Sequence, residues 1–357
     1  MFKEITILGH FNLHKIVNDF LMAIFFLVVG CEIKHEILYG SLSSRKKATF
    51  PIVAACGGVT VPALIFLMFN YNTQFSNGIG VPISTDIAFA IGIFMLLKKR
   101  LNPSLKIFLL SLAVVDDLMS ILVIGIVYSS NINIFGVLGA AIVMCILVYM
   151  NKILKIKNMV PYLLIGIILW YFVYISEIHS TISGVLLALT IPSKVDNVSE
   201  GKKVTLDQIR EKLSPICNYI ILPLFAFSNT AINLNIGVNY SEVSSLMFGI
   251  IFGLVFGKPI GIMLFSFIAV KLHIAEKPAD VSWSDLLQVA ILAGVGFTMS
   301  IFVAEIAFSY SLEFVQIAKI SILTSALMSI GFTCLTVYLK PMPTTNKVLE
   351  YSMNKTE

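Results

Sequence analysis

Charged side chains are scarce in this sequence. Asp, Glu, Lys and Arg make up 13% of the 357 residues, whereas hydrophobic residues make up 57%. A soluble domain carries about 25% charged residues. The composition therefore excludes a soluble protein and indicates a polytopic, all-α membrane protein.

Cysteine is also infrequent, and no secretory signal peptide is visible. The five cysteines lie in or beside apolar runs and lack the spacing of metal ligands, so we expect packing residues with free thiols, and no cofactor. The first apolar run, 16–33, leads into a hydrophilic loop without a small-residue cleavage site.

Long apolar runs fill most of the chain. A membrane span needs roughly 20 mainly apolar residues. Eleven runs qualify, counting a few short ones: 16–33, 48–69, 81–97, 103–128, 133–150, 159–176, 178–193, 215–234, 245–270, 286–308 and 315–339. Because the connections are short, we expect a single transport domain over 16–340, with tails at 1–15 and 341–357.

The capping box Thr205-x-x-Gln208 predicts a short surface helix that ends before Pro215.

Lys and Arg are absent from every second loop, namely 70–80, 129–132, 177, 235–244 and 309–314. All but four of the 25 basic residues fall in the alternate loops and the C-terminal tail. Cytoplasmic loops collect Lys and Arg, so we expect the C-terminus inside and the N-terminus outside. This distribution explains the net charge of +5 without nucleic-acid binding.

Two adjacent aspartates, Asp116 and Asp117, lie in the middle of the apolar run 103–128. One carboxylate at the bilayer centre costs roughly 2.5–3.5 kcal/mol on insertion scales, and such residues usually mark proton or cation pathways. Neighbouring side chains on a helix point about 100° apart. We therefore expect one aspartate to pair with a base and the other to face a water-filled path; the alternative is a purely structural buried network.

Lys258 is the expected partner, because it lies mid-span between Gly257 and Pro259 and cannot easily reach water. A purely structural ion pair is the alternative. Lys319, the other lysine within a span, is expected to snorkel towards the membrane surface, and Glu305 to face water.

Two spans contain residues that break helices. Thr85 and Asp86 follow Pro82 in a short span, and Gly294 and Gly296 interrupt another. Unwound backbone at membrane depth is tolerated only where it lines a cavity or is buried in protein. Two such interruptions point to the binding site of a transporter. Freed helix ends carry roughly half a charge, which Asp86 and Lys258 can neutralise.

Four motifs carry a resemblance to a known family. They are Thr85-Asp86-Ile87-Ala88-Phe89-Ala90, Ala113-Val114-Val115-Asp116-Asp117-Leu118, Gly257-Lys258-Pro259-Ile260-Gly261 and Gly294-Val295-Gly296-Phe297-Thr298-Met299-Ser300-Ile301-Phe302. In these residues, and in unbroken order over about residues 5–340, the chain resembles the NhaA-type Na+/H+ antiporters.

The resemblance implies inverted repeats, with two discontinuous helices that cross at mid-membrane. It implies a secondary active antiporter, not an enzyme, in the bacterial cytoplasmic (inner) membrane. The exchange would be electrogenic, cytoplasmic Na+ or Li+ against external H+, and would serve sodium and pH homeostasis. Asp117, Asp116 and Thr85 would bind the transported ion, while Lys258 and Asp86 compensate charge.

The chain departs from the family pattern in two places. It begins within the segment that follows the family's usual first span. The stretch Phe2–Leu8 thus offers only one short strand for pairing between subunits, and we expect a weak homodimer. The second departure is at the start of the eighth span, where Arg210 and Glu211 stand in a stretch without the family's histidines. These two residues, with Glu32, His35 and Glu36 at the inner end of the first span, are expected to regulate the pH response.

Two other functions fit part of the sequence. An intramembrane aspartyl protease also needs two aspartates, but on separate helices and with a Gly-x-Gly-Asp motif that is absent here. A proton-coupled symporter for an organic solute would need more polar residues at membrane depth. Counterflow of labelled Na+ in vesicles without organic solute distinguishes the three.

The basic-loop pattern yields a test of topology. A green fluorescent protein fused to the C-terminus should fluoresce in the cytoplasm, whereas one fused to the N-terminus and exported unfolded should not, because an odd number of spans separates the ends. Fluorescence from both fusions would contradict eleven spans.

Overall fold

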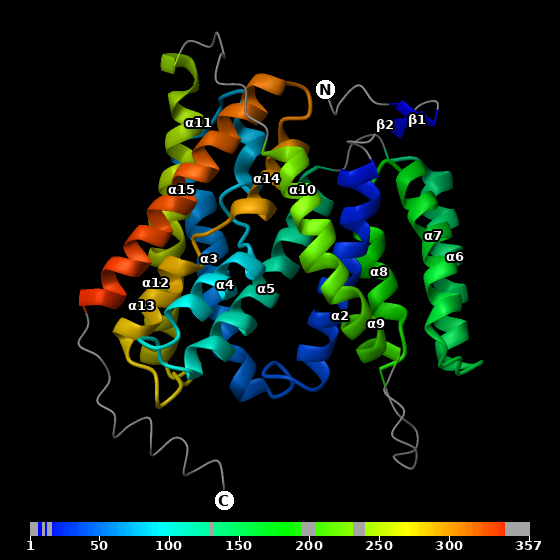
Figure 1. Cartoon of the computed structure of the whole chain (residues 1–357), viewed down its shortest axis with the longest axis horizontal. Coiled ribbons are helices and arrows are strands. Elements are labelled where there is room, and N and C mark those ends of the chain that lie inside the picture. Colours follow the sequence, from blue (N-terminus) through cyan, green and yellow to red (C-terminus); the bar gives the residue numbers. More distant parts are fainter. Residues whose placement is uncertain are drawn as a thin grey trace, which may run out of the picture.

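The computed structural model describes residues 6–8, 11–12, 16–128, 132–193, 205–230 and 240–339. It consists of helices and one small antiparallel ladder (Figure 1). In chain order the elements are β1 (Thr6–Leu8), β2 (Phe11–Asn12), η2 (Ile16–Leu21), α2 (Met22–Leu38), α3 (Arg45–Asn70), η3 (Ser76–Gly80), α4 (Ile87–Leu97), α5 (Ser104–Val127), α6 (Ile134–Lys152), α7 (Met159–Ile175), α8 (Ile182–Thr190), α9 (Thr205–Ile216), η5 (Cys217–Ile221), α10 (Leu222–Asn229), α11 (Tyr240–Phe252), η6 (Gly253–Gly257), α12 (Lys258–Lys271), α13 (Trp283–Leu292), α14 (Phe297–Ala307) and α15 (Leu312–Leu339).

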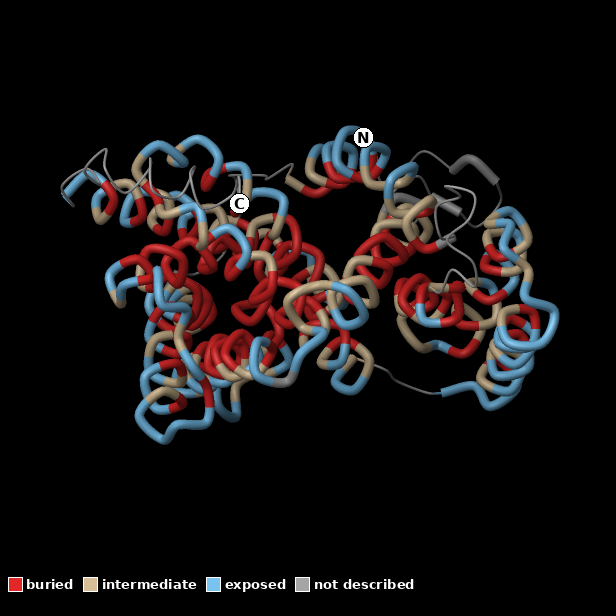
Figure 2. The backbone as a smooth tube through the Cα atoms, turned by 90° about the horizontal axis from the view of Figure 1, so that it is seen from below, coloured by how far each residue is buried: buried red, intermediate tan, exposed pale blue. Residues whose placement is uncertain are grey.

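The helices form two groups that lie side by side. In Figure 1 one group holds α3–α5 and α11–α15, and the other holds α2 and α6–α10. Figure 2 shows the buried backbone inside each group and the exposed backbone on the outside. One apolar cluster, which includes Phe26, Val114, Phe225 and Phe302, joins α2, α5, α10 and α14 across the two groups. The carboxylate-bearing helix α5 therefore lies at the boundary.

Length and composition support a polytopic membrane protein. Among the described residues, five helical stretches are long and apolar enough to cross a membrane: Lys46–Asn70, Ser104–Val127, Ile134–Lys152, Val243–Lys271 and Leu312–Leu339. A sixth is formed if α13 and α14 count as one span, although they bend by 47° at their junction. We call α13 and α14 the bent pair. The other expected spans are built of shorter helical pieces.

Capping side chains define several helix starts. Asn133 accepts a hydrogen bond from the backbone N–H of Phe135, and Asn158 from that of Val160. At α13, Ser282 and Asp285 form a reciprocal capping box. These contacts satisfy backbone donors that have no partner in the first helical turn.

Two π-helical segments precede prolines. Segment η5 is followed by Pro223 and segment η6 by Pro259, each at the start of the next α-helix. Proline has no N–H to donate and its ring clashes with the carbonyl four residues earlier, so the turn before it widens. Segment η6 leads directly into Lys258.

Helices α3 and α12 meet through backbone atoms at two glycines. A β-carbon added at Gly261 would lie 2.1 Å from the carbonyl oxygen of Gly57, and one added at Gly57 would lie 2.2 Å from that of Gly261. No side chain fits at either position. This contact places α12, and with it Lys258, directly against α3.

Three expectations differ from the structure or lie beyond it. The N-terminal stretch forms a two-stranded ladder, with Thr6 opposite Asn12 and Leu8 opposite Phe11, where a single strand was expected. The helix that begins at Thr205 continues through Pro215 into η5 instead of ending before the proline. The tail 341–357 and most of the tail 1–15 lie outside the described residues.

The glycine contact predicts that a single added methyl group lowers the stability of the protein. Gly261→Ala should destabilise the protein by about 1–3 kcal/mol, the range for an overpacked core. Gly331 on α15 is the matched control, because a β-carbon there meets nothing within 4 Å. Thermal melting in mild detergent should show a lower midpoint for Gly261→Ala and an unchanged or higher one for Gly331→Ala. Equal midpoints would contradict the contact.

Candidate ion-binding site

The backbone is interrupted at two places that lie against each other. Residues 81–86, which include Pro82, are not helical, and residues 293–296 separate the two halves of the bent pair. The N–H of Asp86 donates a hydrogen bond to the carbonyl oxygen of Val295 (2.9 Å). A β-carbon at Gly294 would lie 2.5 Å from the carbonyl oxygen of Leu254, and one at Gly296 2.8 Å from that of Ser84. Both glycines are therefore required by close backbone approach.

Asp86 caps two helices at once. One carboxylate oxygen accepts a hydrogen bond from the N–H of Phe89 in the first turn of α4 (3.0 Å). The other accepts one from the N–H of Thr298 in the first turn of α14 (3.0 Å), and a second from the Thr298 hydroxyl. Helix α14 begins after Gly296, which has no capping side chain. A single buried carboxylate thus faces two positive helix N-termini.

Lys258 connects this crossing to the aspartate pair. Its ammonium forms an ion pair with Asp116 and donates a hydrogen bond to the hydroxyl of Thr85. That hydroxyl in turn donates to the carbonyl oxygen of Ala293 (2.9 Å). The residue Lys258 is 1% exposed. The structure therefore brings Thr85, Asp116 and Lys258 together in one buried network.

Asp117 lies beside this network but outside it. The residue is 1% exposed, and within the described part of the chain its Oδ1 atom has no hydrogen-bond partner. A buried carboxylate oxygen without a partner is costly. Asp116 is paired with a base, as expected. Asp117 was expected to face a water-filled path but is buried, and it keeps one acceptor available.

Besides Thr85, serine hydroxyl groups that were not expected surround the crossing. The Ser84 hydroxyl donates to Ser120 on α5 (3.4 Å), and the Ser300 hydroxyl approaches the Ser84 carbonyl oxygen (3.5 Å). Ser300 follows Thr298 in the glycine-containing motif, so that motif was the signal for it. Ser84 and Ser120 are buried serines whose proximity depends on the tertiary structure.

The residues expected to regulate the pH response lie on α2 and α9. His35 and Arg210 both approach the carboxylate of Asp207, at 3.7 Å each. Sequence analysis did not single out Asp207, although its position three residues before Arg210 on one helix was a usable signal. Glu36 accepts hydrogen bonds from the N–H and hydroxyl of Ser41. Glu32 lies on α2 and Glu211 on α9.

Two expectations about isolated charges were wrong. Lys319 does not snorkel to a membrane surface, and Glu305 does not face water. They form an ion pair with an N–O distance of 2.5 Å between α14 and α15, and their side chains are only 6% and 11% exposed. Nothing in the local sequence of either helix links these two residues.

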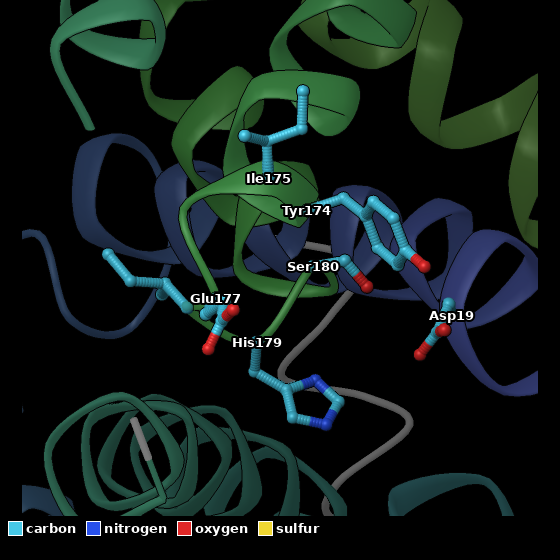
Figure 3. A pocket seen from close by; sticks show the side chains of 7 residues that line it. Asp19, Tyr174, Ile175, Glu177, His179 and Ser180 are labelled. Atoms are coloured by element: carbon cyan, nitrogen blue, oxygen red, sulfur yellow. The ribbon is translucent and has the colours of Figure 1, made fainter. Parts of the chain in front are cut away.

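A separate cavity of about 440 Å³ opens between η2 and the connection from α7 to α8. Figure 3 shows Asp19 on one side, with Tyr174, Glu177, His179 and Ser180 from the end of α7 and the following loop. The imidazole of His179 is hydrogen-bonded to Thr181 (3.1 Å) and lies edge-on to Phe302. None of the residues around Lys258 lines this cavity.

Buried charges at the junction of interrupted helices are typical of polytopic membrane proteins that transport ions. Comparison with known proteins agrees. A family model described as Na+/H+ antiporter 1 matches residues 2–337. A Na+/H+ antiporter NhaA of Helicobacter pylori is 42% identical, over 89% of this chain and 81% of its own length. An antiporter NhaA 1 of Flavobacterium johnsoniae is 43% identical, over 97% and 88%. The chain therefore belongs to the Na+/H+ antiporter 1 family.

The buried ion pair predicts a specific stability defect. Lys258→Met leaves Asp116 buried without its base, and removing one partner of such a pair typically costs roughly 3–5 kcal/mol. Lys271→Met is the matched control, because Lys271 is an exposed lysine on the same helix. Thermal melting in detergent should show a large loss for Lys258→Met and little change for Lys271→Met.

A double variant separates the pairing from the loss of the lysine itself. Lys258→Met combined with Asp116→Asn removes both charges, and should recover much of the lost melting temperature. A double variant as unstable as Lys258→Met alone would mean that the pairing does not account for the defect.

Proposed function

We propose that this protein is a secondary active antiporter that exchanges cytoplasmic Na+ or Li+ for external H+. The exchange is electrogenic and serves sodium and pH homeostasis. The protein lies in a bacterial cytoplasmic (inner) membrane, with its N-terminus outside and its C-terminus inside. Family membership and the names of the relatives support the exchange of Na+ and H+. The basic-loop pattern supports the orientation.

The unpartnered carboxylate oxygen of Asp117 is the main support for this proposal. It lies in a buried site beside the Asp116–Lys258 pair. Carboxylate and hydroxyl oxygens are hard ligands that suit a hard cation. Asp117 is therefore proposed as the principal cation ligand, with Asp116 and the hydroxyl of Thr85 as further ligands.

The charge balance of the site fits one monovalent cation. When all are ionised, the three carboxylates of Asp86, Asp116 and Asp117 with the ammonium of Lys258 leave two negative charges. The N-termini of α4 and α14 offset roughly one of these. One Na+ neutralises the remaining charge. In the proton-bound state more than one proton replaces the Na+, and this excess makes the exchange electrogenic. Lys258 and Asp86 thus compensate charge and do not carry the ion.

Competition between Na+ and H+ for the same carboxylates is sufficient for exchange when the site opens alternately to the two sides of the membrane. The proposed architecture has eleven spans with inverted repeats. Residues 81–97 and the bent pair are its two discontinuous helices, which cross at mid-membrane. Their hydrogen bonds to each other at Asp86 support that arrangement.

Two further assignments complete the proposal. Glu32, His35, Glu36, Arg210 and Glu211 adjust the response to pH from the cytoplasmic end, and the Asp207 contacts of His35 and Arg210 support a linked charge cluster there. The protein forms at most a weak homodimer in the lipid membrane, because so short a two-stranded ladder is marginal as an interface.

Asp117→Asn tests the central assignment. The substitution keeps the size of the side chain but removes its charge, so Na+-dependent dissipation of a pH gradient in everted vesicles should be lost while insertion stays normal. The control is Asp280→Asn, which changes an exposed aspartate in the loop before α13. Exchange by Asp117→Asn at the wild-type rate in saturating Na+ would refute the assignment.

The same vesicles test competition for one site. In wild-type protein the Na+ concentration that gives half-maximal exchange should rise as the pH is lowered, because protons and Na+ occupy the same carboxylates. A half-maximal concentration independent of pH would indicate separate sites for the two ions.

A further inference from the structure

The buried pair Glu305–Lys319 has no part in the mechanism above, yet it joins the bent pair to α15. Replacing a buried ion pair by well-packed apolar side chains is often neutral or stabilising. Stability alone therefore does not explain charges at this position. Such a pair can instead fix one register between two helices.

A second contact joins the bent pair to α15 at the other end. The side-chain amide of Gln288 on α13 donates to the carbonyl oxygen of Thr336 on α15 (3.3 Å). Gln288 and Glu305 are 17 residues apart, and so are Lys319 and Thr336. Equal spacing on antiparallel segments means that the two contacts specify the same register. They bracket the bend at residues 293–296.

Part of the packing between these contacts consists of small side chains, which contribute little to the choice of register. The buried row Ser321, Ser325, Ser329 and Thr333 repeats every four residues along α15. Three of these hydroxyls donate to carbonyl oxygens of α15 itself. Ser329 faces Gly294 at the bend. A row of similar small side chains distinguishes poorly between positions one turn apart.

The register matters because Asp86 caps the N-terminus of α14. Thr298 donates its N–H and hydroxyl to that carboxylate, and Glu305 lies seven residues later on the same helix. Seven residues are about two helical turns, or about 10 Å, so both lie on nearly the same face. A shift of α14 at Glu305 is carried by the helix to Thr298.

We propose that Glu305 and Lys319 are positioning residues for cation binding. Together with the Gln288–Thr336 contact, their ion pair holds the bent pair in one register on α15 and keeps the start of α14 against Asp86. The link to cation binding rests on the proposed function, whereas the positional effect does not.

The test uses the double variant Glu305→Gln/Lys319→Met, which removes the ion pair without leaving an unpaired charge. Glu313→Gln, an exposed carboxylate in the first turn of α15, is the control. Amide hydrogen exchange of the full-length protein in detergent is measured for residues 84–90 and 295–302. Exchange in both segments should be several-fold faster in the double variant and unchanged in the control. Wild-type exchange rates in the double variant would overturn the proposal.

Transport kinetics give the second readout. The apparent KM for Na+ of the double variant should rise several-fold with little change in the maximal rate per inserted protein. Lys319→Arg, which keeps the ion pair, should retain the wild-type KM. A purely structural role would lower the amount of inserted protein and leave KM unchanged, and that result would overturn the link to cation binding. If wild-type protein shows no Na+-dependent exchange, the proposed function fails, while hydrogen exchange still decides the positional effect.

Discussion

The shared cap at Asp86 is the interaction on which the rest of the interior depends. Two helix starts, α4 and α14, would otherwise place unsatisfied backbone donors at the centre of a membrane protein. One carboxylate accepts from both and faces both positive helix ends. The interruption of each helix is thereby tolerated. The hydroxyl of Thr85 and the carbonyl of Ala293, which lie at the two breaks, become available to the network of Lys258.

The surrounding helices hold this crossing in place through close backbone contacts. The glycine pair Gly57 and Gly261 brings α12 against α3, and Gly294 brings the bend against Leu254. Each of these glycines lies where a β-carbon would meet a carbonyl oxygen. Charged groups at depth are therefore positioned mainly by backbone packing, and much less by long side chains reaching inward.

The sequence predicted those features that depend on the residues of a single segment. Polytopic membrane character follows from composition, and the helix breaks around Asp86 and Gly294 follow from local proline, glycine and charge. It was least informative for partners from distant helices. The pairing of Glu305 with Lys319, and the approach of His35 on α2 to Asp207 on α9, depend on tertiary packing that no local pattern encodes. The count of spans also stays a prediction, because several are built of short helical pieces.

The π-helical segment η6 has a consequence for how this span is compared between proteins. Its wider turn accommodates one residue more than an α-helical turn, so the faces of α11 and α12 are out of phase by about 100°. No single helical wheel drawn over residues 240–271 places both halves correctly. In a relative that lacks one residue in this turn, the lysine would lie on a different face of the helix, even if every residue of the Gly-Lys-Pro motif is preserved. The number of residues in this turn therefore says as much about the position of the lysine as the identity of the residues does.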